Sequence, residues 1–158
     1  MEIIKLDSKD RHILEILQED ADIHVSELAQ RVGLSQTPCW RRIQRMKEQG
    51  VIVKNVTLVK PQMVNVGVTV FVAVRTSTHT AAWFDQFKAV VEAIPEVVEF
   101  YRMSGEIDYL LRVVVPDIAA YDKVYKRLIA GTSLQDVSSS FAMEEIKFTT
   151  ALPMSYAP

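Results

Sequence analysis

The stretch SQTPCWRRIQRMKEQGVI, residues 35–52, predicts one helix with a basic flank, followed by a turn toward a strand. Ser35 can accept hydrogen bonds from the free amides of the first turn, as N-cap residues do. Pro38 falls within that first turn, where a missing amide costs little. Gly50 can close the carboxyl end of the helix. We therefore expect a helix over about residues 36–49.

The apolar residues of this helix form one narrow stripe. Cys39, Ile43 and Met46 are spaced four and three residues apart, which places them on the same helix face. We expect this stripe to be buried. Cys39, the single cysteine of the chain, is then a core thiol rather than a metal ligand or a nucleophile. The remaining face carries Gln36, Thr37, Trp40, Arg41, Gln44, Arg45 and Lys47.

Positive charge is concentrated around this helix. Residues 31–54 hold six basic side chains and one acidic side chain, in a chain whose formal net charge is −2. Guanidinium groups bind phosphates and guanine edges, and such a face suits a nucleic-acid groove. A solvated basic face is the alternative interpretation. The residues expected to contact double-stranded DNA are Gln36, Thr37, Pro38, Trp40, Arg41, Arg42, Arg45 and Lys47, with Arg42 placed nearer to phosphate than to a base.

The preceding residues predict two more helices. Asp7 precedes a helix at residues 8–19. Asp10 lies three positions after Asp7, and this spacing approximates a capping box. Ser26 can cap a short helix at residues 27–32, and Gly33 allows the left-handed turn into the third helix. Two helices joined by a tight glycine turn make a helix-turn-helix.

Two β-branched runs after the third helix predict a small hairpin, or wing. They are residues 51–53 and 56–59, on either side of Lys54-Asn55. We therefore favour a winged helix-turn-helix over residues 1–60, and the alternative is a helical packing domain that touches no nucleic acid. Residues 1–60 hold ten basic and nine acidic side chains, against eight and eleven in residues 61–158. Only the first domain suits nucleic acid.

The second half of the chain changes to an alternating apolar pattern. Residues 61–66 are expected to be a linker, and residues 67–158 a ferredoxin-like domain with the element order βαββαβ. The expected strands are residues 66–76, 97–103, 109–115 and 137–148, and the expected helices lie at residues 81–94 and around 121–128. The fold class is therefore α+β, with the helices of the second domain on one side of its sheet.

Helices on one side leave the other face of that sheet bare. Phe71 and Ala73, with Leu110 and Val114 or their strand neighbours, would form an apolar patch too large for a soluble monomer. Self-association would cover it, so we expect at least a homodimer. A two-fold dimer also suits a pseudo-palindromic DNA operator, because its paired helices meet half-sites about 34 Å apart.

Several stretches in this order resemble the Lrp/AsnC (feast/famine) family of bacterial transcription regulators. They are LDSKDRHILEILQ, SELAQRVGLSQTPCWRRIQRMKEQGVI, GEIDYLLRV and the terminal ALP. The resemblance implies a winged helix-turn-helix joined to an amino-acid-response domain, and dimers that assemble into rings, often octamers. It also implies an amino-acid effector, bound where the response domains of neighbouring dimers meet. TPCWRRIQRM and SSFAMEEIKFTT are similar to the cysteine-responsive DecR-like branch of that family.

The loop at residues 103–109, MSGEIDY, matches the effector-site loop of this family. Gly105 lets the backbone approach a carboxylate, and Asp108 offers a counter-charge for an ammonium group. Without the resemblance, an ordinary tight loop with a local hydrogen bond from Asp108 would be the better interpretation. The expected effector-binding residues are Met103, Ser104, Gly105, Asp108 and Tyr109, with Ser138, Ser139 and Ser140 from a neighbouring subunit. No pattern selects which amino acid binds.

Other classes of protein find less support in the sequence. His12, His24 and His79 lie in separate elements without metal-ligand spacing, and no phosphate loop or nucleophile motif is present, so we expect neither a metal, a cofactor nor catalysis. The sequence has neither a membrane-spanning apolar run nor a signal peptide, so we expect a cytoplasmic, nucleoid-associated protein. The alternative to a sequence-specific regulator is a nucleoid-type architectural protein that wraps DNA with little sequence choice.

Overall fold

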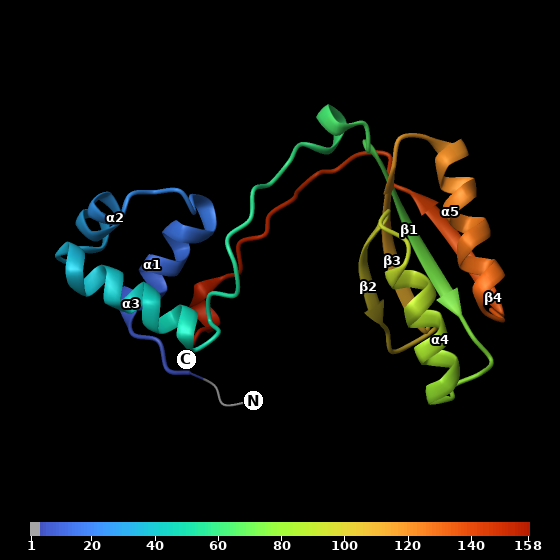
Figure 1. Cartoon of the computed structure of the whole chain (residues 1–158), viewed down its shortest axis with the longest axis horizontal. Helices are drawn as coiled ribbons and strands as arrows, with labels where there is room; N and C mark the ends of the chain where they lie inside the picture. Colours follow the sequence, from blue (N-terminus) through green and yellow to red (C-terminus); the bar gives the residue numbers. More distant parts are fainter. Residues whose placement is uncertain (1–3) are drawn as a thin grey trace. The chain divides into compact units, whose positions relative to one another are not determined.

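The computed structural model describes residues 4–158 and divides the chain into two compact units. One unit contains the chain up to Leu58 together with Lys147–Pro158, and the other contains Val59–Ile146 (Figure 1). This division differs from the expected one, in which the second domain ran to residue 158. The difference arises because the last residues pack against the first helix, where Leu6 N donates to Pro158 O at 2.9 Å.

The first helix, α1 (Ser8–Glu19), begins as the sequence predicted. Asp7 is its N-cap, and a complete capping box forms: Asp10 N donates to Asp7 Oδ1 at 2.9 Å, and Asp7 N donates to Asp10 Oδ2 at 3.2 Å. These hydrogen bonds satisfy amides that have no partner within the helix. The start of α1 is therefore determined by two acidic residues three positions apart.

Helices α2 (Val25–Val32) and α3 (Gln36–Glu48) form the helix-turn-helix. The expected cap of α2 was wrong: the helix begins two residues earlier, with His24 at the N-cap, and Ser26 lies inside its first turn. Gly33 has φ 66° and makes the left-handed turn between the helices. Ser35 is the N-cap residue of α3, as expected, but its side chain makes no capping hydrogen bond.

The carboxyl end of α3 is closed by Gly50, which has φ 74°. Its amide donates to Lys47 O at 3.0 Å, and the Val51 amide donates to Met46 O at 2.8 Å. This pair of hydrogen bonds is a Schellman motif, which requires a left-handed residue after the helix and so favours glycine. Cys39, Ile43 and Met46 are buried, as predicted, and pack on Ile13, Leu28 and Val32 from the other two helices. Burial raises the pKa of the Cys39 thiol, which is typical of an unreactive core cysteine.

The expected wing hairpin was wrong, because residues 51–60 contain no strand. Val51 and Ile52 pack on the helix-turn-helix core, whereas the β-branched side chains of Val53 and Val56 are exposed. A two-stranded hairpin is marginal without a surface to pack on, and Lys54-Asn55 lacks the glycine that favours a tight hairpin turn. The segment then passes through a 3-10 turn, Pro61–Val64, within the expected linker.

A single ion-pair cluster joins α1 to α3. Asp10 is 1% exposed, and its carboxylate accepts hydrogen bonds from Arg42 Nη1 at 2.8 Å and Arg45 Nη2 at 2.5 Å. Arg42 Nη1 also donates to Asp7 Oδ2 at 2.6 Å. The amide of Asp10 and the guanidinium of Arg42 lower the pKa of Asp7, and hydrogen bonds to Asp7 and Asp10 raise the pKa of Arg42. The buried carboxylate therefore fixes how α3 packs on α1.

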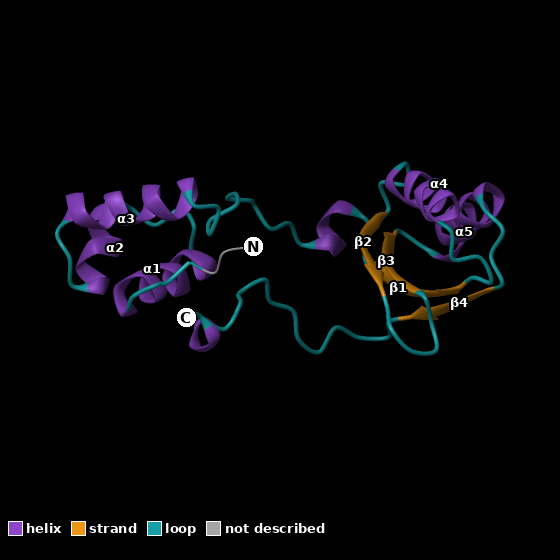
Figure 2. Ribbon diagram, turned by 90° about the horizontal axis from the view of Figure 1, so that it is seen from below, coloured by secondary structure: helices purple, strands orange, loops and turns teal. Residues whose placement is uncertain are grey.

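The second unit has the predicted βαββαβ order. Its elements are β1 (Val68–Arg75), α4 (Ala81–Glu92), β2 (Val97–Arg102), β3 (Tyr109–Val115), α5 (Ile118–Gly131) and β4 (Asp136–Phe141). The strands form one antiparallel sheet in the order β2-β3-β1-β4, and both helices cover the same face of it (Figure 2). The expected last strand was too long, because residues 142–148 form no strand. None of the described helices is long and apolar enough to cross a membrane.

The two faces of this sheet differ in character. Val70, Val72 and Val74 point toward the helices and are almost fully buried, whereas Phe71 points to the open face and is 40% exposed. The expected apolar patch is only partly correct, because Arg112 lies opposite Phe71 in the sheet register. Its guanidinium pairs with Glu99 at 2.5 Å and lowers the pKa of that carboxyl. The open face therefore combines the exposed Phe71 with an ion pair between Arg112 and Glu99.

The Asp10 cluster leads to a stability prediction. Replacing Asp10 with alanine leaves two guanidinium groups facing an apolar interior and removes half of the capping box. We expect the free energy of unfolding to fall by about 2–3 kcal/mol, below the full cost for a buried pair because Arg42 and Arg45 can still reach water. Urea unfolding followed by circular dichroism measures this change. The exposed Asp22→Ala is the matched control, and equal stability of the two variants would contradict the role given to Asp10.

Candidate nucleic-acid interface and effector site

The outward face of α3 presents most of the residues that the sequence assigned to DNA. Gln36, Thr37 and Pro38 are exposed in its first turn, where amide groups are free to bind an anion. Arg41 and Lys47 are exposed further along the helix, and within residues 4–158 neither forms an ion pair. Trp40 is 52% exposed, although it is large and apolar. This face combines free cations with an uncovered aromatic ring.

Arg42 and Arg45 occupy a different environment from Arg41. Both bind Asp10, and the side chain of Arg42 is 27% exposed while that of Arg45 is 46% exposed. Each guanidinium uses a single nitrogen for Asp10 and retains other N–H groups. These arginines therefore serve the packing of the domain, and Arg45 is also open enough to reach a phosphate. Their sequence pattern indicated a role at DNA alone, because no local motif links Arg42 and Arg45 to Asp10 on α1.

The loop between β2 and β3 is held in place by Asp108. Its carboxylate Oδ2 accepts a hydrogen bond from Thr76 N at 2.8 Å, its amide donates to Val74 O at 3.0 Å, and its carbonyl accepts from Met103 N at 2.8 Å. These are the local bonds that the tight-loop interpretation expected. Gly105 has φ 123°, which favours glycine. The loop is therefore a preformed structure in which Met103, Ser104 and Gly105 are exposed.

The second carboxylate oxygen of Asp108 remains available. Among the described residues Oδ1 accepts no hydrogen bond, and the imidazole Nδ1 of His79 lies 4.0 Å from it. His79 lies before α4, far from this loop in the sequence, so no local pattern linked the two. A carboxylate oxygen beside an exposed loop can accept a hydrogen bond from an ammonium group.

The other expected effector residues lie in three environments. Tyr109 is 5% exposed and packs in the core against Trp83 and Phe87, so its ring faces the helices and not the loop. Ser139 faces the same core and is hydrogen-bonded to the Tyr121 hydroxyl. Burial raises the pKa of Tyr121, and the bond to Ser139 opposes that shift. Ser138 and Ser140 are exposed on the open face, opposite Ala73 and Phe71.

The structure therefore brings only part of the expected effector set together in one chain. Residues 103–105 and Asp108 share one loop, next to the end of β1 where Thr76 lies. The serines lie on β4, on the other side of β1 from β3. A second wall formed by serines of a neighbouring subunit stays a prediction.

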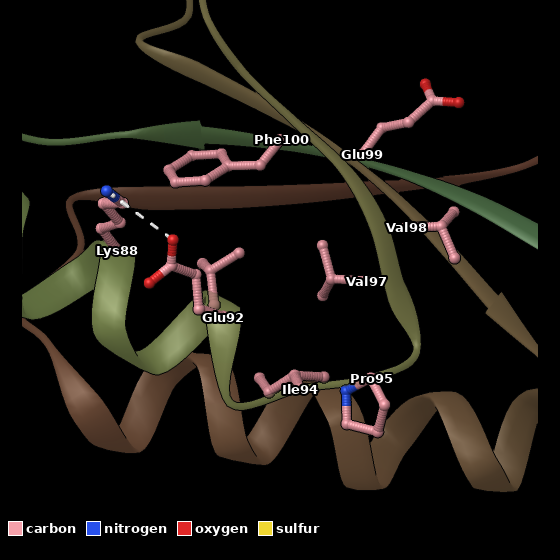
Figure 3. A pocket seen from close by; sticks show the side chains of 9 residues that line it. Lys88, Glu92, Ile94, Pro95, Val97, Val98, Glu99 and Phe100 are labelled. Atoms are coloured by element: carbon pink, nitrogen blue, oxygen red, sulfur yellow. Dashed lines mark ion pairs between the residues drawn. The ribbon is translucent and has the colours of Figure 1, made fainter. Parts of the chain in front are cut away.

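A separate hollow of about 420 Å³ lies between the end of α4 and β2 (Figure 3). Its lining includes Ile94, Pro95 and Val97, with an ion pair between Lys88 and Glu92 at 3.7 Å on its rim. None of the residues expected to bind the effector lines it. Its open, mainly apolar surface has no convergent polar groups of the kind that orient a small ligand.

Two family models match the two parts of this chain. A model of the Lrp/AsnC ligand binding domain matches residues 69–152, which is more than half of the chain. A model of a winged helix-turn-helix DNA-binding domain matches residues 6–53. The second match confirms the winged helix-turn-helix class, and it ends at residue 53, within the region where the hairpin was expected.

Curated relatives match this chain over nearly its whole length. A glutamate uptake regulatory protein of Zymomonas mobilis is 47% identical over 152 residues, covering 96% of this chain and 93% of that protein. The DNA-binding transcriptional activator DecR of Escherichia coli is 45% identical over 150 residues, covering 94% of this chain and 99% of DecR. The resemblance of TPCWRRIQRM to the DecR branch is thus confirmed.

Solved structures agree with both the sequence and the fold. An AsnC family transcriptional regulator from Agrobacterium tumefaciens superposes with a TM-score of 0.93 at 62% identity, covering 96% of this chain and 99% of that one. The transcriptional regulator NMB0573 of Neisseria meningitidis, solved in complex with L-Met, gives a TM-score of 0.91 at 35% identity, with the same coverage. The chain therefore belongs to the Lrp/AsnC family of DNA-binding transcriptional regulators.

Proposed function

We propose that this protein binds a pseudo-palindromic operator through the outward face of α3, and that a small amino acid changes its assembly and its affinity for DNA. The observation that carries the proposal is the face made by Trp40, Arg41 and Lys47, which is exposed and basic on a helix held rigidly by the Asp10 cluster. A recognition helix inserted into the major groove needs such a face and such rigidity. The protein would act in the cytoplasm, at the nucleoid.

Within this interface we assign two kinds of contact. Arg41 has an unpaired guanidinium among the described residues and can bind a guanine edge or a phosphate with both of its terminal nitrogens. Arg42 and Arg45 keep one nitrogen on Asp10, which fixes the direction of their remaining N–H groups and suits backbone phosphates. Gln36 and Thr37, with Pro38, lie at the amino end that enters a groove, and Lys47 lies near the other end.

The effector proposal rests on the loop at residues 103–108. An amino acid carries a carboxylate and an ammonium group on the same carbon atom, so a site needs donors for the first and an acceptor for the second close together. Gly105 exposes its backbone, which can approach the carboxylate because glycine has no side chain. Asp108 Oδ1 is free to accept a hydrogen bond from the ammonium group. Ser138 and Ser140 of a neighbouring subunit would complete the site, and Ser139 would act through its bond to Tyr121. The L-Met bound to the Neisseria regulator supports an amino acid as the ligand class.

The assembly proposal rests on the open face of the sheet. Phe71 is exposed there, and neither α4 nor α5 covers this face (Figure 2). A second copy placed on it by a two-fold axis would bury both Phe71 side chains and would pair two DNA-binding units. We propose a homodimer as the basic unit, with further association of dimers, up to an octamer.

The DNA interface is tested by alanine substitutions on α3. If Arg41 contacts a base, Arg41→Ala is expected to weaken operator binding by about 1–3 kcal/mol. If it contacts a phosphate, the slope of the logarithm of the binding constant against the logarithm of the salt concentration (the salt slope) should fall by about one. Arg42→Ala and Arg45→Ala should reduce the salt slope and also lower stability. Mobility shifts across a salt series measure both effects.

Arg31→Ala is the matched control, because Arg31 is an exposed arginine on α2 that pairs with Glu27. Operator binding unchanged in Arg41→Ala and Arg45→Ala at every salt concentration would rule out this face. In the wild type, uniform coverage of DNA at physiological salt would favour the architectural alternative, and strong site preference the regulator.

The assembly proposal predicts a mass above 17.9 kDa for the native protein in light scattering at micromolar concentration. Phe71→Glu should shift the protein toward the monomer, because it places an unpaired charge in the proposed interface. Ile118→Glu is the control, since Ile118 is exposed at the start of α5, away from the sheet face. A wild-type monomer, or equal masses for the two variants, would contradict the proposal.

The effector site is tested at Asp108. Asp108→Asn keeps an oxygen for the Thr76 amide but removes the charge, so the loop should survive while amino-acid binding is lost. A thermal-shift screen of wild type against the common amino acids identifies the ligand, which raises the melting temperature by mass action. The variant should show no shift and an unchanged affinity for DNA without ligand. Glu106→Gln in the same loop is the control, and a full response in Asp108→Asn would place the site elsewhere.

A further inference from the structure

The last residues of the chain form a defined contact with α1. We call residues 150–158 the terminal strap. Its short 3-10 turn, Met154–Tyr156, lies against α1, and Met154 and Ala157 pack on the helix-turn-helix core. Leu6 N donates to Pro158 O at 2.9 Å, and Arg11 Nη1 donates to Ala157 O at 3.1 Å. The strap is therefore docked at several points along its length.

Gln18 provides the most specific of these contacts. Its side-chain oxygen accepts a hydrogen bond from Leu152 N at 2.7 Å, and its side-chain nitrogen donates to Leu152 O at 3.1 Å. One amide side chain thus pairs with both backbone groups of one strap residue, as a neighbouring strand would. This contact leaves α3 and its ion pairs untouched, so it can be altered separately from the DNA-binding face.

The strap is held less tightly than the core beside it. A cavity of about 770 Å³ lies among α1, residues 51–58 and the strap, with Leu14, Leu17 and Met154 in its lining. Leu152 is 69% exposed even in the docked state. Segments with few buried contacts open locally at lower cost than the domain unfolds. The strap can therefore open while the helix-turn-helix stays folded.

The strap follows β4, which carries Ser138 and Ser140, after a short connection. Residues 142–149 connect them and contain no helix or strand. Its docking site is α1, the helix whose Asp10 holds Arg42 and Arg45 of α3. The chain therefore runs from the serines of β4, which are proposed to bind the effector, to α1, the helix that positions the recognition helix α3.

We propose that the terminal strap transmits effector binding to the helix-turn-helix, with Gln18 as the positioning residue that holds it. This inference rests on the proposed function of the serines on β4 in effector binding. An effector that binds the docked and released states unequally shifts the population between them, and by linkage the strap state alters effector affinity by the same factor. Release of the strap frees α1 and thereby changes how α3 is presented to DNA.

The experiment compares the amino-acid response of DNA binding in full-length wild type and Gln18→Ala. Each common amino acid is added separately to a mobility-shift titration, and the one that changes wild-type affinity is used for both proteins. A wild-type response of about 5–150-fold is expected, the usual range for coupled sites. Gln18→Ala should reduce that factor toward one, because its strap is released and its affinity for DNA has the value of the released state with or without the amino acid. The amino acid should still raise the melting temperature of this variant.

Two further variants separate signal transmission from stability. Gln18→Glu keeps the acceptor for Leu152 N but loses the donor for Leu152 O, so it should give an intermediate response. Gln30→Ala removes the same kind of side chain from the exposed side of α2 and should respond as wild type does. Hydrogen exchange at the Leu152 amide should differ between effector-free and effector-bound wild type, which a purely structural contact would not show.

The outcomes distinguish this inference from the function on which it rests. If the wild type responds to no amino acid, both the effector function and the transmission through the terminal strap, which we call the relay, are overturned. A responsive wild type with an equally responsive Gln18→Ala overturns the relay alone and leaves the effector site intact. Unchanged exchange at Leu152 on effector binding would likewise overturn the relay.

Discussion

The arrangement of the DNA-binding unit depends on one buried carboxylate. Asp10 is 1% exposed, and an isolated charge at that depth would be strongly unfavourable. Arg42 and Arg45 neutralise it from α3, while Asp7 completes the network at the start of α1. Because two guanidinium groups must reach the same carboxylate, the rotation of α3 about its own axis is fixed. That rotation is what turns Trp40, Arg41 and Lys47 outward, so an internal ion-pair cluster determines which residues can meet DNA.

A different constraint shapes the second unit: both of its helices cover the same face of the sheet. The alternation along β1 buries Val70, Val72 and Val74 and leaves Phe71 uncovered. The Arg112–Glu99 pair stands in the middle of that open face, with its charges already neutralised by each other. A second copy placed on this face would bury the ion pair between Arg112 and Glu99, whose charges already neutralise each other. Such a pair limits the registers in which two copies fit, since a shifted copy would set apolar side chains against the charges.

The features that the sequence predicted well have local causes. The Asp7–Asp10 spacing determined where α1 begins, and the short apolar run YLLRVVV predicted β3 with its observed ends. The errors occurred where distant partners decide. β4 cannot run on to residue 148, because Phe141 already pairs with Val70 and β1 begins only two residues further on, at Val68. The second role of Arg42 and Arg45 was hidden because their partner lies on α1, and the link from His79 to Asp108 was hidden for the same reason.

Helix α1 is the element at which the two halves of the proposed mechanism meet. Asp10 lies in its first turn and Gln18 in its last, about 12 Å apart at the rise of an α-helix. Both residues lie on one continuous helix, so a displacement at Gln18 would be passed along that helix to Asp10. Asp10 in turn holds Arg42 and Arg45, which orient the outward face of α3. A signal that arrives through the terminal strap would therefore change the presentation of that face and leave its contact residues unaltered. Regulation of affinity would then be separable from the choice of operator sequence.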